Sequence, residues 1–320
     1  MEHFKAAKIV SVGTCVPDTV LTNSDFEKMV DTTDEWIVTR TGIRKRHVVA
    51  KGSPVTTAQL GSGAARSALE RAGIKPEQVD GIVCATVSPD GLFPSTACKI
   101  QAELGCRRAF AFDISAACAG FIYGLSLAKN FICTGQGATI LVVGSEILSR
   151  VTDYKDRATC ILFGDGAGAA VVQGTNDVNA GILSICLGSD GTLGSILYCD
   201  LWGDSRFMVM EGREVFKHAV RMMSDMAFKA LAAAGLTLGD IDYLVPHQAN
   251  IRIINTLREA LKLAPEKVVV NLENFGNTSS ASIPLALNEA IQDGRIRKGS
   301  TVLFTSLGGG VTVASAVVRF

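Results

Sequence analysis

The chain has 320 residues, of which 48% are hydrophobic, so it is long enough for one large domain or two smaller ones. Its 31 lysines and arginines equal its 31 aspartates and glutamates, which gives a formal net charge of zero. Bulk charge therefore gives no argument for a nucleic-acid partner, and none is expected.

The cysteines form no pattern of a disulfide framework or a metal site. Nine of them are scattered between Cys15 and Cys199, and none forms a Cys-x-x-Cys pair or clusters with histidine at zinc spacing. We therefore expect free thiols, a reducing cytoplasm and no bound metal.

Short apolar strands alternate with helices along the chain. Runs rich in β-branched residues predict strands at 8–12, 81–87, 109–115, 140–144, 169–172, 181–187, 243–246, 268–272, 302–305 and 311–318. Because these runs are almost continuously apolar, we expect sheets that are covered by helices on both faces.

Two stretches of sequence recur 162 positions apart. Residues 68–83 resemble residues 230–245, and each reads as a helix ending at glycine, a loop with Asp and a buried strand. Residues 137–141 match 299–303 at the same offset. The chain therefore reads as two copies of one α/β unit.

The duplication predicts the architecture. We expect one half near residues 1–174 and the other near 175–320, packed as an α/β/α/β/α sandwich about a pseudo-twofold axis. Functional sites in such folds lie beyond the carboxyl ends of the strands.

Cys118 lies between a predicted strand at 109–115 and a predicted helix at 121–134, with Gly135 placed to end that helix. The positive end of the helix dipole would stabilise a thiolate there. Small neighbours leave room for a substrate: Ala116, Ala117, Ala119 and Gly120. The alternative for Cys118 is a small buried core thiol.

Two further candidates come from the second half. His247 follows the predicted strand at 243–246, and its alternative is a hydrogen-bonded structural histidine. Asn277 lies in the loop 274–281, whose composition alone indicates a turn. Since the offset of 162 carries Cys118 into that loop, we expect the three side chains to converge near the axis.

The uncharged segment 299–318 could be mistaken for a membrane span. Gly308-Gly309-Gly310 interrupts it, which predicts two buried strands joined by a tight turn and no membrane helix. The glycines are typical either of a simple turn or of close backbone approach to a ligand, with a free N–H for an oxyanion. The glycine-rich stretch 163–168 is predicted to be a turn into a strand and not a phosphate loop.

Basic residues recur at helical spacing in two places. The first group forms one stripe on a predicted helix, and the second lies on the helix after His247. The two groups are Arg213, Lys217 and Arg221, then Arg252, Arg258 and Lys262. They form either an ordinary solvated face or a docking patch for an acidic carrier.

Together these motifs resemble β-ketoacyl-[acyl carrier protein] synthase III over essentially the whole chain. The resemblance rests on the residues around Cys118, the run His247-Gln-Ala-Asn250, the loop from Asn274 through Asn277, Leu307 with the three glycines, and the stretch 33–44. It implies a thiolase fold, a homodimer, and initiation of type II fatty acid synthesis. Asn277 discriminates within the superfamily, since thiolases resemble a Cys-His-Cys set and elongating synthases a Cys-His-His set.

The resemblance also implies roles for the reactive groups. Cys118 takes an acyl group from an acyl-CoA, and the backbone N–H groups of Cys118 and Gly309 hold the oxyanion. His247 and Asn277 donate hydrogen bonds to the malonyl thioester as CO₂ leaves. No cofactor is needed beyond the CoA thioester substrate.

Binding residues follow from the same resemblance. Trp36 and Arg157 would flank the adenine of CoA, whereas Thr32, Arg40, Phe216, Asn250 and Arg252 would line the pantetheine channel and its mouth. Phe93 would reach across the dimer to close the acyl pocket, and Leu307 stands where a phenylalanine is common. Lys217 and Arg252, with the rest of the basic stripe, would meet the carrier protein.

Three other functions fit parts of the sequence. A related Cys-His-Asn enzyme could start a secondary-metabolite polyketide. A cysteine hydrolase or acyltransferase could use the same residues without a malonyl carrier, and a non-catalytic carrier-binding protein would need none of them.

Overall fold

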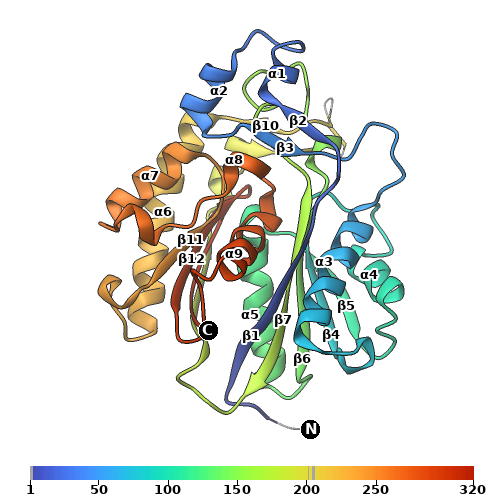
Figure 1. Ribbon diagram of the computed structural model, residues 1–320, viewed down its shortest axis with the longest axis vertical. Helices are drawn as coiled ribbons and strands as arrows, with labels where there is room; N and C mark the ends of the chain where they lie inside the picture. The colour runs from blue at the N-terminus through green and yellow to red at the C-terminus, as the bar shows by residue number, and fades with distance from the viewer. Residues whose placement is uncertain (1–2, 201, 204–205) are drawn as a thin grey trace.

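The computed structural model describes residues 3–200, 202–203 and 206–320. Two large sheets run through it (Figure 1). The strands of the first sheet are, in spatial order, β1 (Ala6–Cys15), β7 (Gly166–Thr175), β6 (Thr139–Glu146), β4 (Gly81–Ala85) and β5 (Phe110–Ile114). Those of the second are β8 (Gly181–Ser189), β13 (Thr312–Arg319), β12 (Thr301–Gly308) and β11 (Tyr243–Pro246).

The two sheets repeat one pattern of strand directions. In the first, β1, β7 and β6 pair antiparallel and β4 then pairs parallel to β6; in the second, β8, β13 and β12 pair antiparallel and β11 pairs parallel to β12. Strands β6 and β12 begin and end 162 positions apart. The predicted duplication is therefore confirmed, whereas a domain boundary at residue 174 stays a prediction.

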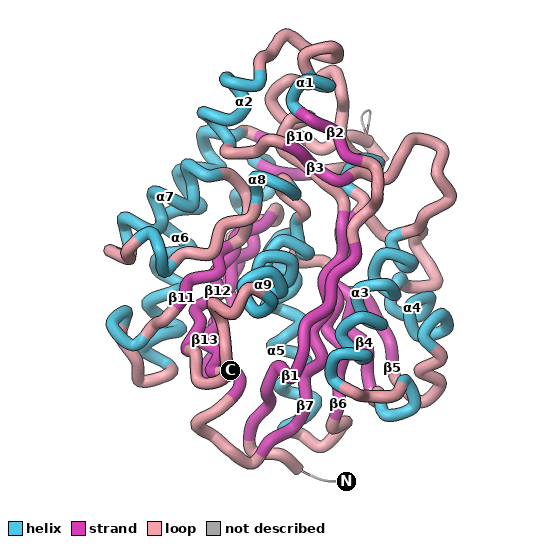
Figure 2. The backbone as a smooth tube through the Cα atoms, in the orientation of Figure 1, coloured by secondary structure: helices cyan, strands magenta, loops and turns pink. Residues whose placement is uncertain are grey.

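Helices cover both faces of both sheets. Helices α5 (Gly120–Cys133) and α9 (Ser282–Gln292) lie between the sheets and contact strands of each (Figures 1 and 2). Helices α3 (Thr57–Ala72) and α4 (Thr96–Leu104) cover the outer face of the first sheet, and α6 (Gly212–Ala233) and α7 (Ile251–Ala260) that of the second. This is the expected α/β/α/β/α sandwich.

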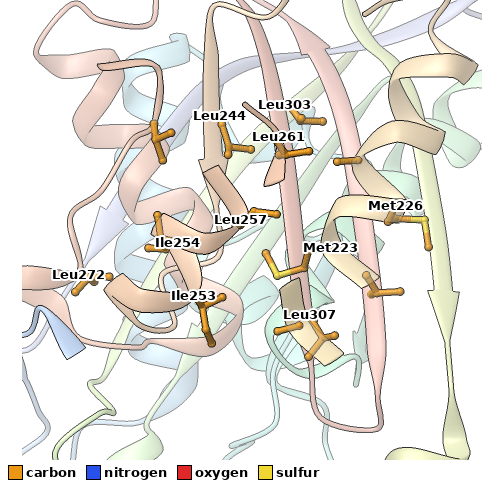
Figure 3. Packing of buried hydrophobic residues seen from close by; sticks show 14 of the residues in the cluster. Met223, Met226, Leu244, Ile253, Ile254, Leu257, Leu261, Leu272, Leu303 and Leu307 are labelled. Carbon is orange, nitrogen blue, oxygen red and sulfur yellow. The ribbon is translucent and has the colours of Figure 1, made fainter. Parts of the chain in front are cut away.

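Burial follows the layers. One apolar cluster fills the space between the sheets, a second lies under α3 and α4, and the third lies under α6 and α7. Figure 3 shows part of the third cluster, in which Met223, Ile253 and Leu307 pack together with residues of the second sheet. Burying these side chains is the main source of stability of such a fold.

Smaller elements lie together at one end of the two large sheets (Figure 1). They are α1 (Asn23–Phe26), α2 (Asp34–Thr41), α8 (Leu272–Phe275), the pair β2 (Val20–Thr22) and β3 (Lys45–His47), and the pair β9 (Leu197–Tyr198) and β10 (Val209–Met210). Short 3₁₀ helices lie at Pro76–Gln78, Ala117–Ala119, Leu148–Arg150, Gly191–Ile196, Leu238–Asp240, Pro265–Lys267 and Ser279–Ala281.

One predicted strand was wrong. Residues 268–272 form only an isolated bridge between Val268 and Leu244. Pro246 has no N–H to extend the ladder, and the Gln248 side chain takes its place by donating to Val269 O and accepting from Asn271 N. A side-chain amide thus replaces the backbone pairing that β5 makes in the first half.

Two local predictions are confirmed. The helix after Cys118 ends in a Schellman motif, with Gly135 N donating to Ile132 O and Gln136 N to Phe131 O, and Gly135 has φ of 75°. The uncharged segment near the C-terminus forms β12 and β13 joined by a turn. Within the described ranges, no helix is both long and apolar enough to span a membrane.

Candidate active site

A cavity of about 1080 Å³ lies where the two halves meet at the carboxyl ends of their parallel strands. Its walls include residues of both halves, among them Cys118, His247, Asn277, Ser279, Leu307 and Gly309. The structure therefore brings the three predicted reactive side chains, Cys118, His247 and Asn277, to one cavity. Their convergence was inferred from the repeat, and the geometry agrees with it.

Cys118 sits on a strained elbow between β5 and α5. Ala117 has φ of 44°, a left-handed conformation that non-glycine residues rarely adopt. Hydrogen bonds from the second half hold the elbow: Ser306 Oγ donates to Cys118 O at 2.8 Å, and Thr312 Oγ1 donates to Ala116 O at 2.8 Å. The second sheet thus fixes the backbone that presents the sulfur.

The sulfur is more deeply buried than the sequence suggests. Burial raises the pKa of the Cys118 thiol to about 12, and the nearby Ser279 hydroxyl only partly offsets this. Burial thus opposes the thiolate that the helix dipole was expected to stabilise, and it favours the neutral thiol at this position.

His247 follows β11 and is held by its backbone, since its N–H donates to Thr305 O at 2.9 Å. The residue is 3% exposed, and burial lowers the pKa of its imidazole to about 3. The imidazole is therefore neutral at physiological pH. Its Nδ1 has no hydrogen-bond partner among the described residues.

Asn277 is positioned by groups from both halves. Its backbone N–H donates to Leu162 O and its carbonyl accepts from Gly164 N, which fixes it beside the stretch 163–168. That stretch leads into a strand, as predicted, but β7 begins at Gly166, three residues earlier than expected. The side-chain Oδ1 accepts from Ser279 N at 2.9 Å, so the amide nitrogen Nδ2 is the group left to donate.

The end of β12 closes on the elbow of Cys118. A Cβ at Gly308 would lie 2.5 Å from Cys118 N, so only glycine permits this approach. Gly309 follows at the cavity wall. Gly309 and Cys118 therefore line the same cavity, and their N–H groups stay the predicted pair of oxyanion donors.

The predicted adenine-binding residues form a cluster at α2. The guanidinium of Arg40 lies 4.4 Å from the centre of the Trp36 ring, and that of Arg157 lies 5.0 Å from it. An adenine between Trp36 and Arg157 needs about 3.5 Å on each side, so Arg157 must move to admit one. Thr32 is near the start of this helix, and its Oγ1 is buried without a partner among the described residues.

The other predicted channel residues lie on α6 and α7. Phe216 and Asn250 line the cavity, and the guanidinium of Arg252 lies 5.9 Å from the centre of the Phe216 ring. Asn250 caps α7 by accepting from Arg252 N at 2.8 Å. Gly42, at the end of α2, lies against Ile251 at the start of α7. The predicted adenine-binding residues near α2 and the predicted channel residues on α6 and α7 are therefore neighbours.

The two predicted acyl-pocket residues differ in position. Leu307 is buried and lines the cavity. Phe93 is 87% exposed and does not line the cavity of its own chain within the described residues. Any contribution of Phe93 to an acyl pocket would therefore be made to another copy of the chain.

The predicted docking residues are mostly exposed. Lys217 pairs with Glu214 at 3.4 Å, whereas Arg258 donates to Leu263 O and pairs with Glu259 at 3.0 Å. Arg258 is thus partly committed to Glu259 in its own helix and to Leu263 just after it. Among the six predicted docking residues, five have exposed side chains: Arg213, Lys217, Arg221, Arg252 and Lys262.

Two polar residues at the site were not identified from the sequence. Ser279 lines the cavity, and Glu146 is fully buried at the end of β6 with four hydrogen bonds. The offset of 162 could have found Ser279, since it maps onto Ala117 beside the nucleophile. Glu146 had one signal, a charged residue ending an otherwise apolar strand.

Comparison with known families agrees with this geometry. Residues 112–191 match the family described as 3-Oxoacyl-[acyl-carrier-protein (ACP)] synthase III, and residues 231–320 match the description of its C-terminal part. The β-ketoacyl-[acyl-carrier-protein] synthase III of Caldanaerobacter subterraneus is 49% identical over 98% of both chains. That of Aquifex aeolicus is 47% identical over 98% of this chain and 99% of its own.

Solved structures share the fold. The crystal structure of the 3-oxoacyl-[acyl-carrier-protein] synthase III of Aquifex aeolicus superposes with a TM-score of 0.94 at 46% identity, over 98% of this chain and all of that one. A priming β-ketosynthase from the R1128 polyketide pathway has a TM-score of 0.94 at 38% identity, over 100% of this chain and 98% of that one. With its thiolase fold, the chain belongs to the β-ketoacyl-[acyl carrier protein] synthase III family.

Proposed function

We propose that this chain is a condensing acyltransferase that initiates type II fatty acid synthesis by joining a short acyl-CoA primer, acetyl-CoA first, to malonyl-[acyl carrier protein]. The observation that carries this is the convergence of Cys118, His247 and Asn277, from two related halves, on one cavity. Relatives that are 47–50% identical over nearly the whole chain are named β-ketoacyl-[acyl-carrier-protein] synthase III.

The first step transfers the acyl group to Cys118. The sulfur forms a bond to the thioester carbonyl, the bond to the CoA sulfur breaks, and the thiol proton leaves on CoA. The N–H groups of Cys118 and Gly309 hold the oxyanion of the tetrahedral intermediate. Because burial raises the pKa of the Cys118 thiol, loss of the thiol proton is part of the work of this step.

The second step joins the two carbon units. The bond between malonyl carbon and carboxylate breaks, and its electron pair forms an enolate whose oxygen accepts hydrogen bonds from neutral His247 and from Asn277 Nδ2. The enolate carbon attacks the acyl carbonyl and expels the Cys118 sulfur as a thiolate, which takes up one proton from solvent. The products are β-ketoacyl-carrier and CO₂, and no metal or redox cofactor takes part.

Partners follow from the same assignment. The CoA and pantetheine groups would be bound by seven residues: Trp36, Arg157, Thr32, Arg40, Phe216, Asn250 and Arg252. The exposed basic residues of α6 and α7 would bind an acidic carrier. A cytoplasmic homodimer is expected, with Phe93 of each copy reaching the acyl pocket of the other.

The alternatives are not favoured. The polyketide-priming relative is 38% identical, against 49% for a fatty-acid-type synthase III. A hydrolase would need water at the acyl-enzyme, and it would have no use for the amide donor Asn277. A non-catalytic binding protein would need none of Cys118, His247 and Asn277.

The test is condensation of acetyl-CoA, isobutyryl-CoA and a longer acyl-CoA with malonyl-carrier. We expect a β-ketoacyl-carrier product with at least one primer and its loss in Cys118→Ser. Hydrolysis of acyl-CoA without any β-ketoacyl product would overturn the proposal.

A further inference from the structure

The structure contains a second elbow, related to that of Cys118 by the offset of 162. The 3₁₀ turns Ala117–Ala119 and Ser279–Ala281 correspond, as do the starts of α5 and α9. The residues that open the two turns share a left-handed backbone, with φ of 44° at Ala117 and 48° at Ser279. Ser280 therefore stands where Cys118 stands in the first half.

The two elbows differ in what faces them. Opposite Cys118, β12 ends at Gly308, which has no side chain. At the corresponding place opposite Ser280, β6 ends at Glu146, whose Oε1 accepts from Ser280 Oγ at 2.8 Å. Ser280 is 1% exposed and is not among the described lining residues of the cavity, so the second elbow is closed.

Glu146 ties this closed elbow to the first half. Its Oε2 accepts from Ser88 Oγ at 2.6 Å, from Val87 N at 3.0 Å and from Thr86 Oγ1 at 3.2 Å, and these three residues form the chain that leaves β4. The carboxyl group is fully buried. It therefore links Ser280 to the segment that follows β4 in the other half.

The closed elbow also orients Asn277. The N–H of Ser279, adjacent to Ser280, donates to Asn277 Oδ1. The strained φ of Ser279 persists only where its surroundings hold it. The Ser280 hydroxyl supplies that restraint, because its one proton is shared between two acceptors, Glu146 Oε1 at 2.8 Å and Ala85 O at 2.9 Å.

We propose that Ser280 and Glu146 are positioning residues that hold the Asn277 amide in place for the condensation step, through the backbone of Ser279. This inference rests on the proposed function, which assigns Asn277 to condensation and not to acyl transfer. The turn that carries Ser280 in the second half thus has the same backbone as the turn that carries Cys118. Its role in this proposal is to position the hydrogen-bond donor of Asn277.

Single-turnover rates separate the two half-reactions. One measures acetyl transfer from acetyl-CoA to Cys118 by mass, and the other measures product from malonyl-carrier on enzyme acetylated beforehand. In Ser280→Ala we expect acetyl transfer within about threefold of wild type and condensation lower by on the order of 10- to 100-fold, since misplacing a catalytic group by about 1 Å costs that much.

Three further variants make the test specific. Ser280→Ala in an Asn277→Ala background should lose nothing more, because both changes remove one function. Glu146→Ala should reproduce the loss, whereas Glu146→Gln, which keeps a hydrogen-bonding atom at both oxygen positions, should restore condensation. Ser184→Ala, which removes a buried hydroxyl that donates to Ala230 O at 2.6 Å under α6, is the control for simple loss of a buried hydrogen bond.

The inference is overturned if Ser280→Ala slows both half-reactions equally, if it leaves condensation unchanged, or if its effect adds to that of Asn277→Ala. It is also overturned if Glu146→Gln is as impaired as Glu146→Ala. Failure of the proposed function is a different result, in which wild-type enzyme itself forms neither acetyl-Cys118 nor product.

Discussion

At the scale of single residues, burial favours the uncharged forms of Cys118 and His247. Burial raises the pKa of Cys118 to about 12 and lowers that of His247 to about 3. Burial therefore disfavours a Cys–His ion pair in the resting site. The sequence predicted the helix end behind Cys118, but it could not predict the depth of burial, because the walls of the cavity come from distant segments.

The protonation of Cys118 can be tested by its rate of alkylation. Because only the thiolate reacts, the raised pKa predicts a rate on Cys118 that climbs about tenfold per pH unit and is still climbing at pH 9, the ordinary pKa of a thiol. Peptide mass mapping with iodoacetamide separates Cys118 from the exposed Cys199. A plateau below pH 8 would mean that the helix dipole prevails over burial.

Trp36 provides a second residue-scale test. If its ring and Arg157 hold the adenine, Trp36→Ala should raise KM for acetyl-CoA roughly 10-fold, which corresponds to about 1.4 kcal/mol of binding free energy. The KM for malonyl-carrier, which has no adenine, should stay within about twofold. An equal rise in both KM values would contradict the assignment.

At the scale of elements, the close approach of β12 to the Cys118 elbow depends on Gly308. In Gly308→Ala, the added methyl group would lie 2.5 Å from Cys118 N and 2.9 Å from Ala117 Cβ. We expect a loss of about 1–3 kcal/mol in the free energy of unfolding and slow acetyl transfer. Denaturant unfolding and acyl-enzyme mass measure the two effects.

Gly191→Ala is the matched control for that change, because a Cβ there meets nothing within 4 Å and its backbone needs no left-handed conformation. It should leave both measurements unchanged. Normal acetyl transfer and stability in Gly308→Ala would show that the elbow does not need this contact.

Elements with local signals were predictable from the sequence. The apolar runs gave nine strands correctly in position, and Gly135 marked the end of α5. The strand predicted at 268–272 failed because the Gln248 side chain replaces backbone pairing, which no periodicity reveals. The pairs β2–β3 and β9–β10 were missed because strands of two or three residues carry too little pattern.

At the scale of the whole molecule, the internal repeat predicted where the reactive residues lie but not the whole of the site. The offset of 162 located the Asn277 loop opposite Cys118, and the same offset relates Ser280 and Glu146 to their counterparts. The acyl pocket could not be predicted in this way, since Phe93 lies away from the cavity of its own chain.

A dimer would give the exposed Phe93 a partner. Sedimentation should give twice the chain mass of 33.7 kDa, and Phe93→Ala should shift primer preference toward longer acyl chains without changing the KM for malonyl-carrier. A fully active monomer, with a primer preference insensitive to Phe93, would contradict this arrangement.

The most direct measurement is the mass of the Cys118 peptide after brief exposure to acetyl-CoA, compared with Cys118→Ser. The account predicts one acetyl group on Cys118 in the wild type, its discharge when malonyl-carrier is added with appearance of β-ketoacyl-carrier, and no such thioester in the variant. A wild-type Cys118 that stays unmodified by acetyl-, isobutyryl- and longer acyl-CoA would contradict the central claim.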